Sequence, residues 1–323
     1  MKKVLVGLAV TLLIIAYVTI SNKPQPEGTV WIGGGPQGGA LVVFAEGLAE
    51  LLQNASPDLD VNVIGSGGSV ANIRSIQAGK LDLAWGYAAD IYLGYEGRLV
   101  EDQPPFDNVL VLGRVFGSTA QLVVPRDSVI RSPYDLVNRR IAIGCSGSGS
   151  AHSAERYFRA IGIWDEIIPL YMGYDLGIQE MNKGRAEAIW QLVGIPSPSI
   201  TTLSAERSIR LLNLFDAAEE HQLFVDFPFY TESVIPAGTY PGIGEPVRSY
   251  LDNTLLVTHQ DVDPQLIKLV LQVLYSPEGI SYMRKKDPMA LDLDLVHGLQ
   301  GVKTPLHPEA VQFWWKQGVK NNR

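Results

Sequence analysis

The chain has 323 residues, of which 46% are hydrophobic, and it carries 34 acidic against 26 basic side chains. This length and apolar content can fill two domain cores, which excludes a disordered or fibrous protein. The formal net charge of -8 argues against broad electrostatic attraction to nucleic acid or to an anionic lipid surface. An anion that binds must therefore be held by local dipoles or by a single buried cation.

The N-terminus is typical of an export signal. Lys2 and Lys3 precede an uncharged apolar stretch at 4–20, and a polar segment that contains Pro24 and Pro26 follows. The length of the stretch falls between that of a signal-peptide core and the roughly 20 residues that span a bilayer, and no clean cleavage site follows it. Two expectations stay open: a signal peptide that is removed, or an uncleaved anchor that tethers the protein to the inner membrane.

Strand, loop and helix patterns alternate along the chain. A strand at 29–32 leads through a glycine-rich segment into a helix with apolar positions 44, 48, 51 and 52. The unit recurs at 61–79, and a further strand at 81–85 ends at Gly86 and Tyr87. Because strand and helix alternate, we expect an α/β fold with a largely parallel sheet.

The second half of the chain repeats this unit. Strands are predicted at 109–112 and 121–124, and a strand at 141–143 then enters a Gly/Ser-rich loop and a helix that ends near residue 161. Further predicted elements are a helix at 177–183, strands at 186–192 and 255–258, a helix at 265–275 and a C-terminal helix through Trp314 and Trp315. The spacing of this tryptophan pair from Val311 indicates packing rather than a ligand site.

Three loops, at 33–39, 65–69 and 144–150, each lie where a strand ends and a helix begins. Glycine lets the backbone approach a ligand closely, and a helix start presents free N–H groups with a partial positive charge. Together they can hold a carboxylate. The loops also carry serines whose hydroxyls can bind a ligand or, more commonly, cap their own helices: Ser66, Ser69, Ser146, Ser148 and Ser150.

Gly33, Gly35 and Gly38 satisfy G-x-G-x-x-G after a strand, which raises a dinucleotide-dependent oxidoreductase as an alternative. The acidic residue that should end the second strand and bind the ribose is missing, because Gly65 and Ser66 stand there. The serines of 144–150 form no G-x-S-x-G elbow, and five scattered histidines give no metal-ligand spacing. We therefore expect no catalysis, no cofactor and no metal.

The strand ends supply further candidate residues. Tyr87 and the pair Trp190 and Gln191 lie at carboxyl ends of strands, where open α/β sheets bind ligands. One side chain of an adjacent pair must face away, since strand residues alternate. Cys145 is expected to be a small buried cysteine. The candidates for pairing with a ligand carboxylate, among which the sequence does not choose, are Arg74, Arg114 and Arg185.

Four segments in one order resemble the TAXI family of solute-binding proteins of TRAP transporters. They read GSGGSVANIRSIQAGKLDLA at 65–84, IAIGCSGSGS at 141–150, VIPAGTYPG at 234–242 and PLHPEA at 305–310. The resemblance implies a type II-like periplasmic binding fold, in which two lobes, each a mostly parallel sheet flanked by helices, enclose a ligand cleft. One lobe would comprise 28–118 and 251–323 and the other 119–250, after a leader and linker at 1–27.

The resemblance further implies a monomeric periplasmic receptor that captures a small organic anion of the glutamate-like or 2-oxo acid class. The receptor would deliver this ligand to the membrane permease of a TRAP transporter. A membrane-anchored ligand sensor is the alternative. The residues implied to line the cleft are Gly35, Gln37, Gly38, Ser66, Ser69, Tyr87, Ser146, Ser148, Ser150 and Gln191.

The chain departs from the family pattern in one place. Members usually read GGTYY where this chain reads GGALV at 38–42. Three hydroxyl-bearing side chains become apolar, so we expect one polar contact to the ligand to be lost. The ligand is then expected to be larger than glutamate, less polar, or different in kind.

Overall fold

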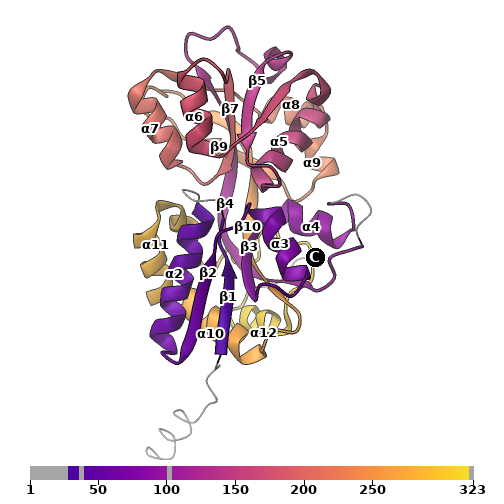
Figure 1. Cartoon of the computed structure of the whole chain (residues 1–323), viewed down its shortest axis with the longest axis vertical. Coiled ribbons are helices and arrows are strands. Elements are labelled where there is room, and N and C mark those ends of the chain that lie inside the picture. Colours follow the sequence, from indigo (N-terminus) through magenta and orange to yellow (C-terminus); the bar gives the residue numbers. More distant parts are fainter. Residues whose placement is uncertain (1–27, 36–39, 100–103, 320–323) are drawn as a thin grey trace, which may run out of the picture.

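The computed structural model describes residues 28–35, 40–99 and 104–319. One 10-stranded sheet runs through the molecule in the order β2-β1-β3-β10-β4-β7-β5-β6, with β8 paired to β4 and β9 to β10. The strands are β1 (Gly28–Gly33), β2 (Leu59–Ile64), β3 (Leu83–Tyr87), β4 (Val109–Pro125), β5 (Arg140–Gly144), β6 (Ile168–Tyr171), β7 (Ala188–Val193), β8 (Ile209–Leu211), β9 (Thr231–Ile235) and β10 (Val247–His259). Two lobes form around its two ends (Figure 1).

The first lobe, at the bottom of Figure 1, contains β1, β2 and β3. β1 pairs in parallel with both of its neighbours, as the alternating pattern predicts. The helices of this lobe are α2 (Ala40–Ala55), α3 (Ser69–Gln77), α4 (Ala88–Tyr95), α10 (Pro264–Leu274), α11 (Pro277–Lys286) and α12 (Pro308–Lys316). The N-terminal and C-terminal parts of the chain therefore build one lobe together.

The second lobe, at the top of Figure 1, repeats this plan with β5, β6 and β7. β5 pairs in parallel with β6 and with β7. The helices of this lobe are α5 (Gly149–Ala160), α6 (Tyr174–Asn182), α7 (Pro198–Glu206), α8 (Phe215–Glu220) and α9 (Leu223–Asp226). Each lobe is thus a mixed sheet flanked by helices. The strands β1–β3 and β5–β7 pair in parallel, and β10 and β4 join them antiparallel, so the largely parallel sheet expected from the alternating pattern holds only for these three-strand units.

Two long strands, β4 and β10, connect the lobes and pair antiparallel from Val109 opposite His259 to Thr119 opposite Leu251. The prediction of separate short strands at 109–112 and 121–124 is wrong, because both belong to the 17-residue β4. The glycines and polar residues between them interrupt the apolar pattern but not the backbone pairing. The predicted lobe limits fall inside β4 and β10 and stay a prediction.

Aromatic side chains fill both cores. In the first lobe, Phe44 lies edge-on to Trp85 and 4.7 Å from Phe116, measured between ring centroids. In the second lobe, Tyr157 packs against Trp190 and Tyr250. Burial of such large apolar rings is the main favourable term in the folding of each lobe.

The C-terminal helix closes the first lobe on the back of β4. Trp314 is 1% exposed and its indole N–H donates to the Leu112 carbonyl oxygen over 2.8 Å, which confirms its predicted packing role. Trp315 is 78% exposed, so the packing expected for it is wrong. Gly113 lies beneath this contact, and a Cβ there would stand 2.5 Å from Tyr275 Oη and 2.7 Å from Trp314 Cζ2.

We predict that Gly113→Ala lowers the free energy of unfolding by about 1–3 kcal/mol, because a methyl group overpacks the contact between β4 and α12. Gly244→Ala is the matched control, since a Cβ at that exposed position meets nothing within 4 Å. Urea denaturation of both variants measures the difference. Equal midpoints for the two variants would show that Tyr275 and Trp314 move aside at no cost.

Candidate functional site

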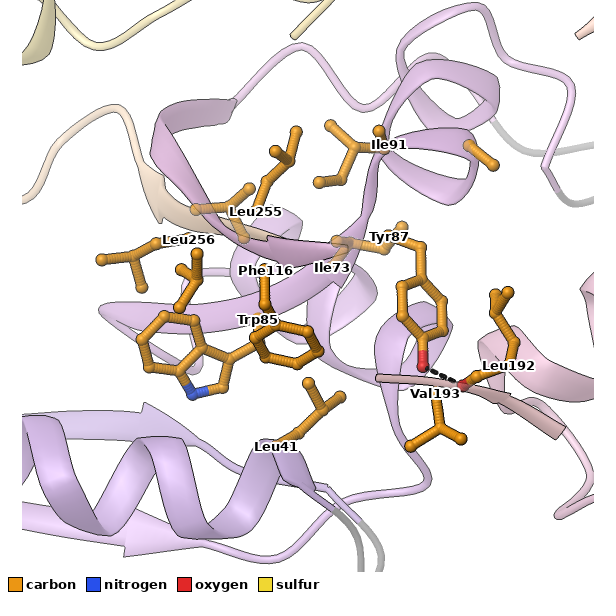
Figure 2. Close-up of a cluster of buried hydrophobic side chains, with 14 of the residues drawn as sticks. Leu41, Ile73, Trp85, Tyr87, Ile91, Phe116, Leu192, Val193, Leu255 and Leu256 are labelled. Atoms are coloured by element: carbon orange, nitrogen blue, oxygen red, sulfur yellow. Dashed lines mark hydrogen bonds between the residues drawn. The ribbon is translucent and has the colours of Figure 1, made fainter. Parts of the chain in front are cut away.

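A cavity of about 130 Å³ lies between the two lobes. At 10–15 Å³ for each water-sized sphere it has room for on the order of ten water-sized groups, which suits a small molecule. Figure 2 shows part of its wall, with Leu41 and Phe116 of the first lobe facing Leu192 and Val193 of the second. The cavity is lined by Ala40, Leu41, Gly68, Ser69, Tyr87, Phe116, Ser118, Gly144, Cys145, Ser148, Gly149, Ser150, Gly173, Tyr174, Asp175, Leu176, Leu192 and Val193.

Helix starts from both lobes meet at this cavity. α3 of the first lobe and α5 and α6 of the second each contribute their N-cap residue and first helical residues to its wall. The first N–H groups of a helix have no acceptor within it. In α5, the Ala151 N–H donates to Ser148 Oγ, which leaves the amides of Gly149 and Ser150 at the cavity wall. The starts of α3 and α5 supply partial positive charge without a basic side chain, whereas the first turn of α6 carries the carboxylate of Asp175.

Tyr87 joins the lobes at the cavity wall. Its hydroxyl donates to the Leu192 carbonyl oxygen over 2.8 Å, across the cleft (Figure 2). The Tyr174 hydroxyl donates to the same oxygen over 3.1 Å from within the second lobe. Burial raises the pKa of Tyr174 to about 12 and holds the pKa of Tyr87 well above its usual range. Both phenols are therefore neutral donors at neutral pH.

Four of the serine and tyrosine residues predicted from sequence lie in the cavity wall: Ser69, Tyr87, Ser148 and Ser150. Their hydroxyls also organise the site. Ser69 Oγ accepts from the Tyr87 N–H over 2.9 Å, and Ser150 Oγ donates to the Ile143 carbonyl oxygen over 3.2 Å. Ser148 caps α5, the commoner role expected of such a serine. The capping hydroxyl and the free amides beside it face the same space.

The other predicted residues lie elsewhere. Gln37 and Gly38 are outside the described residues, and the cavity wall does not include Gly35 or the exposed Ser146. Ser66 Oγ donates to the Gly34 carbonyl oxygen and accepts from the Gly68 N–H, so it shapes its own loop.

Gln191 does not line the cavity. Its amide group hydrogen-bonds to Ser197 and Ser199 at 2.8 and 2.9 Å. Trp190 is fully buried in the aromatic core, and β7 continues to Val193. Leu192 and Val193 consequently line the cavity at the end of this strand. The predicted strand ends at 192, and its candidate site residues are Trp190 and Gln191, so the prediction identifies neither Leu192 nor Val193.

None of the three candidate arginines lines the cavity. Arg74 and Arg185 are exposed, and Arg185 pairs with Glu180. Arg114 is 4% exposed and donates to Asn253 Oδ1 over 2.6 Å. It also forms an ion pair with Asp292, which connects β4 to the segment after α11. Among the described lining residues there is no lysine or arginine.

Sequence reasoning missed the contribution of α6 to the site. Tyr174, Asp175 and Leu176 begin this helix and line the cavity, but the predicted helix begins only at 177, three residues late. Only the glycine at 173, before a helical pattern, signalled a helix start. Cys145, expected to be buried, is half-buried and lines the cavity. It lies where β5 has ended and the Gly/Ser-rich loop opens towards the cleft.

A buried ion pair also bridges the lobes, beside the cavity. Arg156 of α5 donates to Asp90 Oδ1 of α4 over 2.9 Å, and the two side chains are 10% and 0% exposed. The Arg156 Nε–H donates to the Tyr230 hydroxyl oxygen over 2.7 Å. Burial, with the charge of Asp90 nearby, raises the pKa of Asp252 well above its usual range. These charged groups hold α4 against α5 where the lobes meet.

Comparison with known proteins gives a family and a fold. A family model described as the NMT1-like family matches residues 32–318. A solved structure of a Bordetella bronchiseptica RB50 protein aligns with a TM-score of 0.53 at 14% identity, covering 93% of this chain and 92% of that one. A Listeria monocytogenes protein, provisionally named an L-cystine ABC transporter, aligns with a TM-score of 0.50 at 14% identity, covering 82% and 97%.

The alkanesulfonate-binding protein SsuA from Xanthomonas axonopodis pv. citri, bound to MOPS, aligns with a TM-score of 0.48 at 15% identity, covering 83% of this chain and 81% of that one. The Bordetella and Listeria structures share the two-lobed α/β fold of this chain. Over the part of the chain that the structure describes, no helix combines the length and hydropathy needed to cross a bilayer. The predicted leader at 4–20 lies outside that part.

We predict that Tyr87→Phe opens the molecule, because it removes a hydrogen bond worth about 1 kcal/mol between the lobes. Tyr174→Phe is the matched control, since it removes a bond to the same Leu192 oxygen from within one lobe. Small-angle scattering of the ligand-free proteins should give a larger radius of gyration for Tyr87→Phe than for Tyr174→Phe. Identical scattering curves would show that the Tyr87 bond does not hold the lobes together.

Proposed function

This chain belongs to the NMT1-like family, and we propose that it is the extracytoplasmic solute-binding receptor of a membrane transporter for a small organic anion. One observation carries the proposal: helix starts from two lobes converge, with serine hydroxyls, on a single cavity between the lobes. Such a site can hold a carboxylate by backbone N–H groups and helix dipoles. The net charge of -8 favours this local recognition over attraction by the whole surface.

The binding step follows from this geometry. An anion held by the start of α3 on one side and by the start of α5 on the other interacts with both lobes only when they are closed. Its binding energy therefore favours the closed form over the open one. A membrane partner that recognises the closed form would then receive loaded receptors in preference to empty ones.

The permease partner is proposed from the sequence segments that resemble TAXI proteins. These segments carry the Ser69 and Ser148 helix starts that line the cavity. We propose a TRAP-type permease, a carboxylate ligand of the glutamate-like or 2-oxo acid class, a periplasmic location and a monomeric receptor. A membrane-anchored sensor is the second candidate, and the apolar stretch at 4–20 is the observation that favours it.

We predict that small carboxylates raise the melting temperature of the full-length protein, whereas nicotinamide dinucleotides do not. Binding to the native state alone stabilises it by about 2.7 kcal/mol at a ligand concentration 100 times Kd, which corresponds to a shift of several degrees. A thermal-shift panel of carboxylates, sulfonates and dinucleotides measures this. A shift with a dinucleotide alone would replace the receptor by an oxidoreductase.

We predict that Ser148→Ala weakens carboxylate binding and also destabilises the fold by about 1 kcal/mol, the typical cost of losing a helix cap. Ser276→Ala removes an equivalent cap from α11, which lies away from the cavity. There, Ser276 Oγ accepts a 2.9 Å hydrogen bond from the Gly279 N–H. Calorimetric titration and urea denaturation should show a similar stability loss in both variants and lower affinity in Ser148→Ala only. Unchanged affinity in Ser148→Ala would remove this hydroxyl from the site.

A further inference from the structure

The cleft has a second compartment outside the cavity. An outer pocket adjoins it and shares four lining residues with it: Ala40, Tyr174, Asp175 and Val193. The remainder of the outer pocket is built by α2 of the first lobe, by α6 and α7 of the second, and by residues 287 and 289. Asp175 therefore stands where the inner cavity opens into the outer pocket, on the path of any ligand that extends beyond the cavity.

The charge along this path has one sign. Asp175 is the charged residue of the inner wall, and Glu206 and Asp287 join it in the outer pocket. Neither compartment has a lysine or arginine among its described lining residues. Negative charge among the described lining residues thus increases from the starts of α3 and α5 towards the first turn of α6 and the outer pocket.

The inner wall between these two regions is apolar. Leu41, Phe116 and Leu176 face the cavity together with Leu192 and Val193. A ligand whose anionic group is held by the helix starts must place the rest of its body against these side chains. A second carboxylate there would lose its hydration without a compensating cation, and it would approach the Asp175 carboxylate.

We infer that the ligand is a monocarboxylate with an apolar body, and that Asp175 is a specificity-determining residue that disfavours dicarboxylates. The inference rests on the proposed function and narrows its ligand class, since glutamate and 2-oxoglutarate both carry a second carboxylate. The favoured ligand has its carboxylate at the starts of α3 and α5, an aliphatic or aromatic chain on the apolar wall, and no negative charge at the far end that approaches Asp175.

The test compares two 2-oxo acids of similar size that differ at the far end. Isothermal titration of the full-length protein is done with 4-methyl-2-oxopentanoate, which ends in a branched alkyl group, and with 2-oxoglutarate, which ends in a carboxylate. We expect 4-methyl-2-oxopentanoate to bind at least about tenfold more tightly, because the second carboxylate is desolvated beside an acidic side chain. Leucine and glutamate repeat the comparison with a 2-amino head.

Two variants test the residues that carry the inference. Asp175→Asn should narrow the ratio of the two affinities by about threefold, a modest change because the side chain is exposed and screened. Asp58→Asn, an equally conservative change at an exposed turn outside the cleft, should leave the ratio as it is. Leu176→Ser, at a side chain that is 48% exposed, should weaken binding of 4-methyl-2-oxopentanoate more than that of 2-oxoglutarate.

The outcomes separate the two proposals. Tighter binding of 4-methyl-2-oxopentanoate, with the ratio reduced in Asp175→Asn, supports the inference. Equal or tighter binding of 2-oxoglutarate or glutamate overturns the inference and leaves the carboxylate receptor standing. An unchanged ratio in Asp175→Asn overturns the role of that residue. Binding of no carboxylate at millimolar concentration overturns the inference and the proposed carboxylate class together.

Discussion

The antiparallel pairing of β4 with β10 is the constraint on which the rest of the molecule depends. These two strands run through both lobes and are hydrogen-bonded from Val109 to Thr119 of β4. They fix which strand ends face each other, so the starts of α3, α5 and α6 meet at one cavity. The register shifts twice within this connection, where β4 carries the extra residues Val115 and Leu112 opposite the steps Thr254–Leu255 and Leu256–Val257 of β10.

Polar and aromatic contacts both join the lobes, and Tyr92 of the first lobe packs against Phe229 of the second. The Tyr87 hydroxyl reaches the Leu192 oxygen, and Arg156 pairs with Asp90. A buried ion pair must offset the loss of hydration of both partners, so its net contribution to closure is small. The neighbouring carboxylate of Asp252, with its raised pKa, adds to that cost when it is ionised. A ligand shifts the balance between open and closed forms only by the difference in its affinity for the two.

The cavity combines anion-binding helix starts with an apolar wall and an acidic exit. In the proposed receptor, this combination would let a protein with a net charge of -8 bind an anion without a basic side chain in the described wall. Backbone amides carry only partial charge, so the proposed site would hold one carboxylate and offer nothing to a second. The carboxylate of Asp175, at the junction of the two compartments, would also repel a second carboxylate of the ligand. Selection then depends on the far end of the ligand.

The sequence by itself determined the strand, loop and helix units and the α/β class, because periodicity and glycine placement are local properties. It also identified Ser148 and Tyr87 as residues of the cavity wall, since a residue at a strand end or helix start reaches the carboxyl edge of the sheet wherever that strand lies. Only the tertiary structure decided that β4 is continuous and that Leu192, not Gln191, faces the cavity. Those outcomes depend on pairing with β10 and on strand register, which bring together residues more than a hundred positions apart and leave no trace in local sequence.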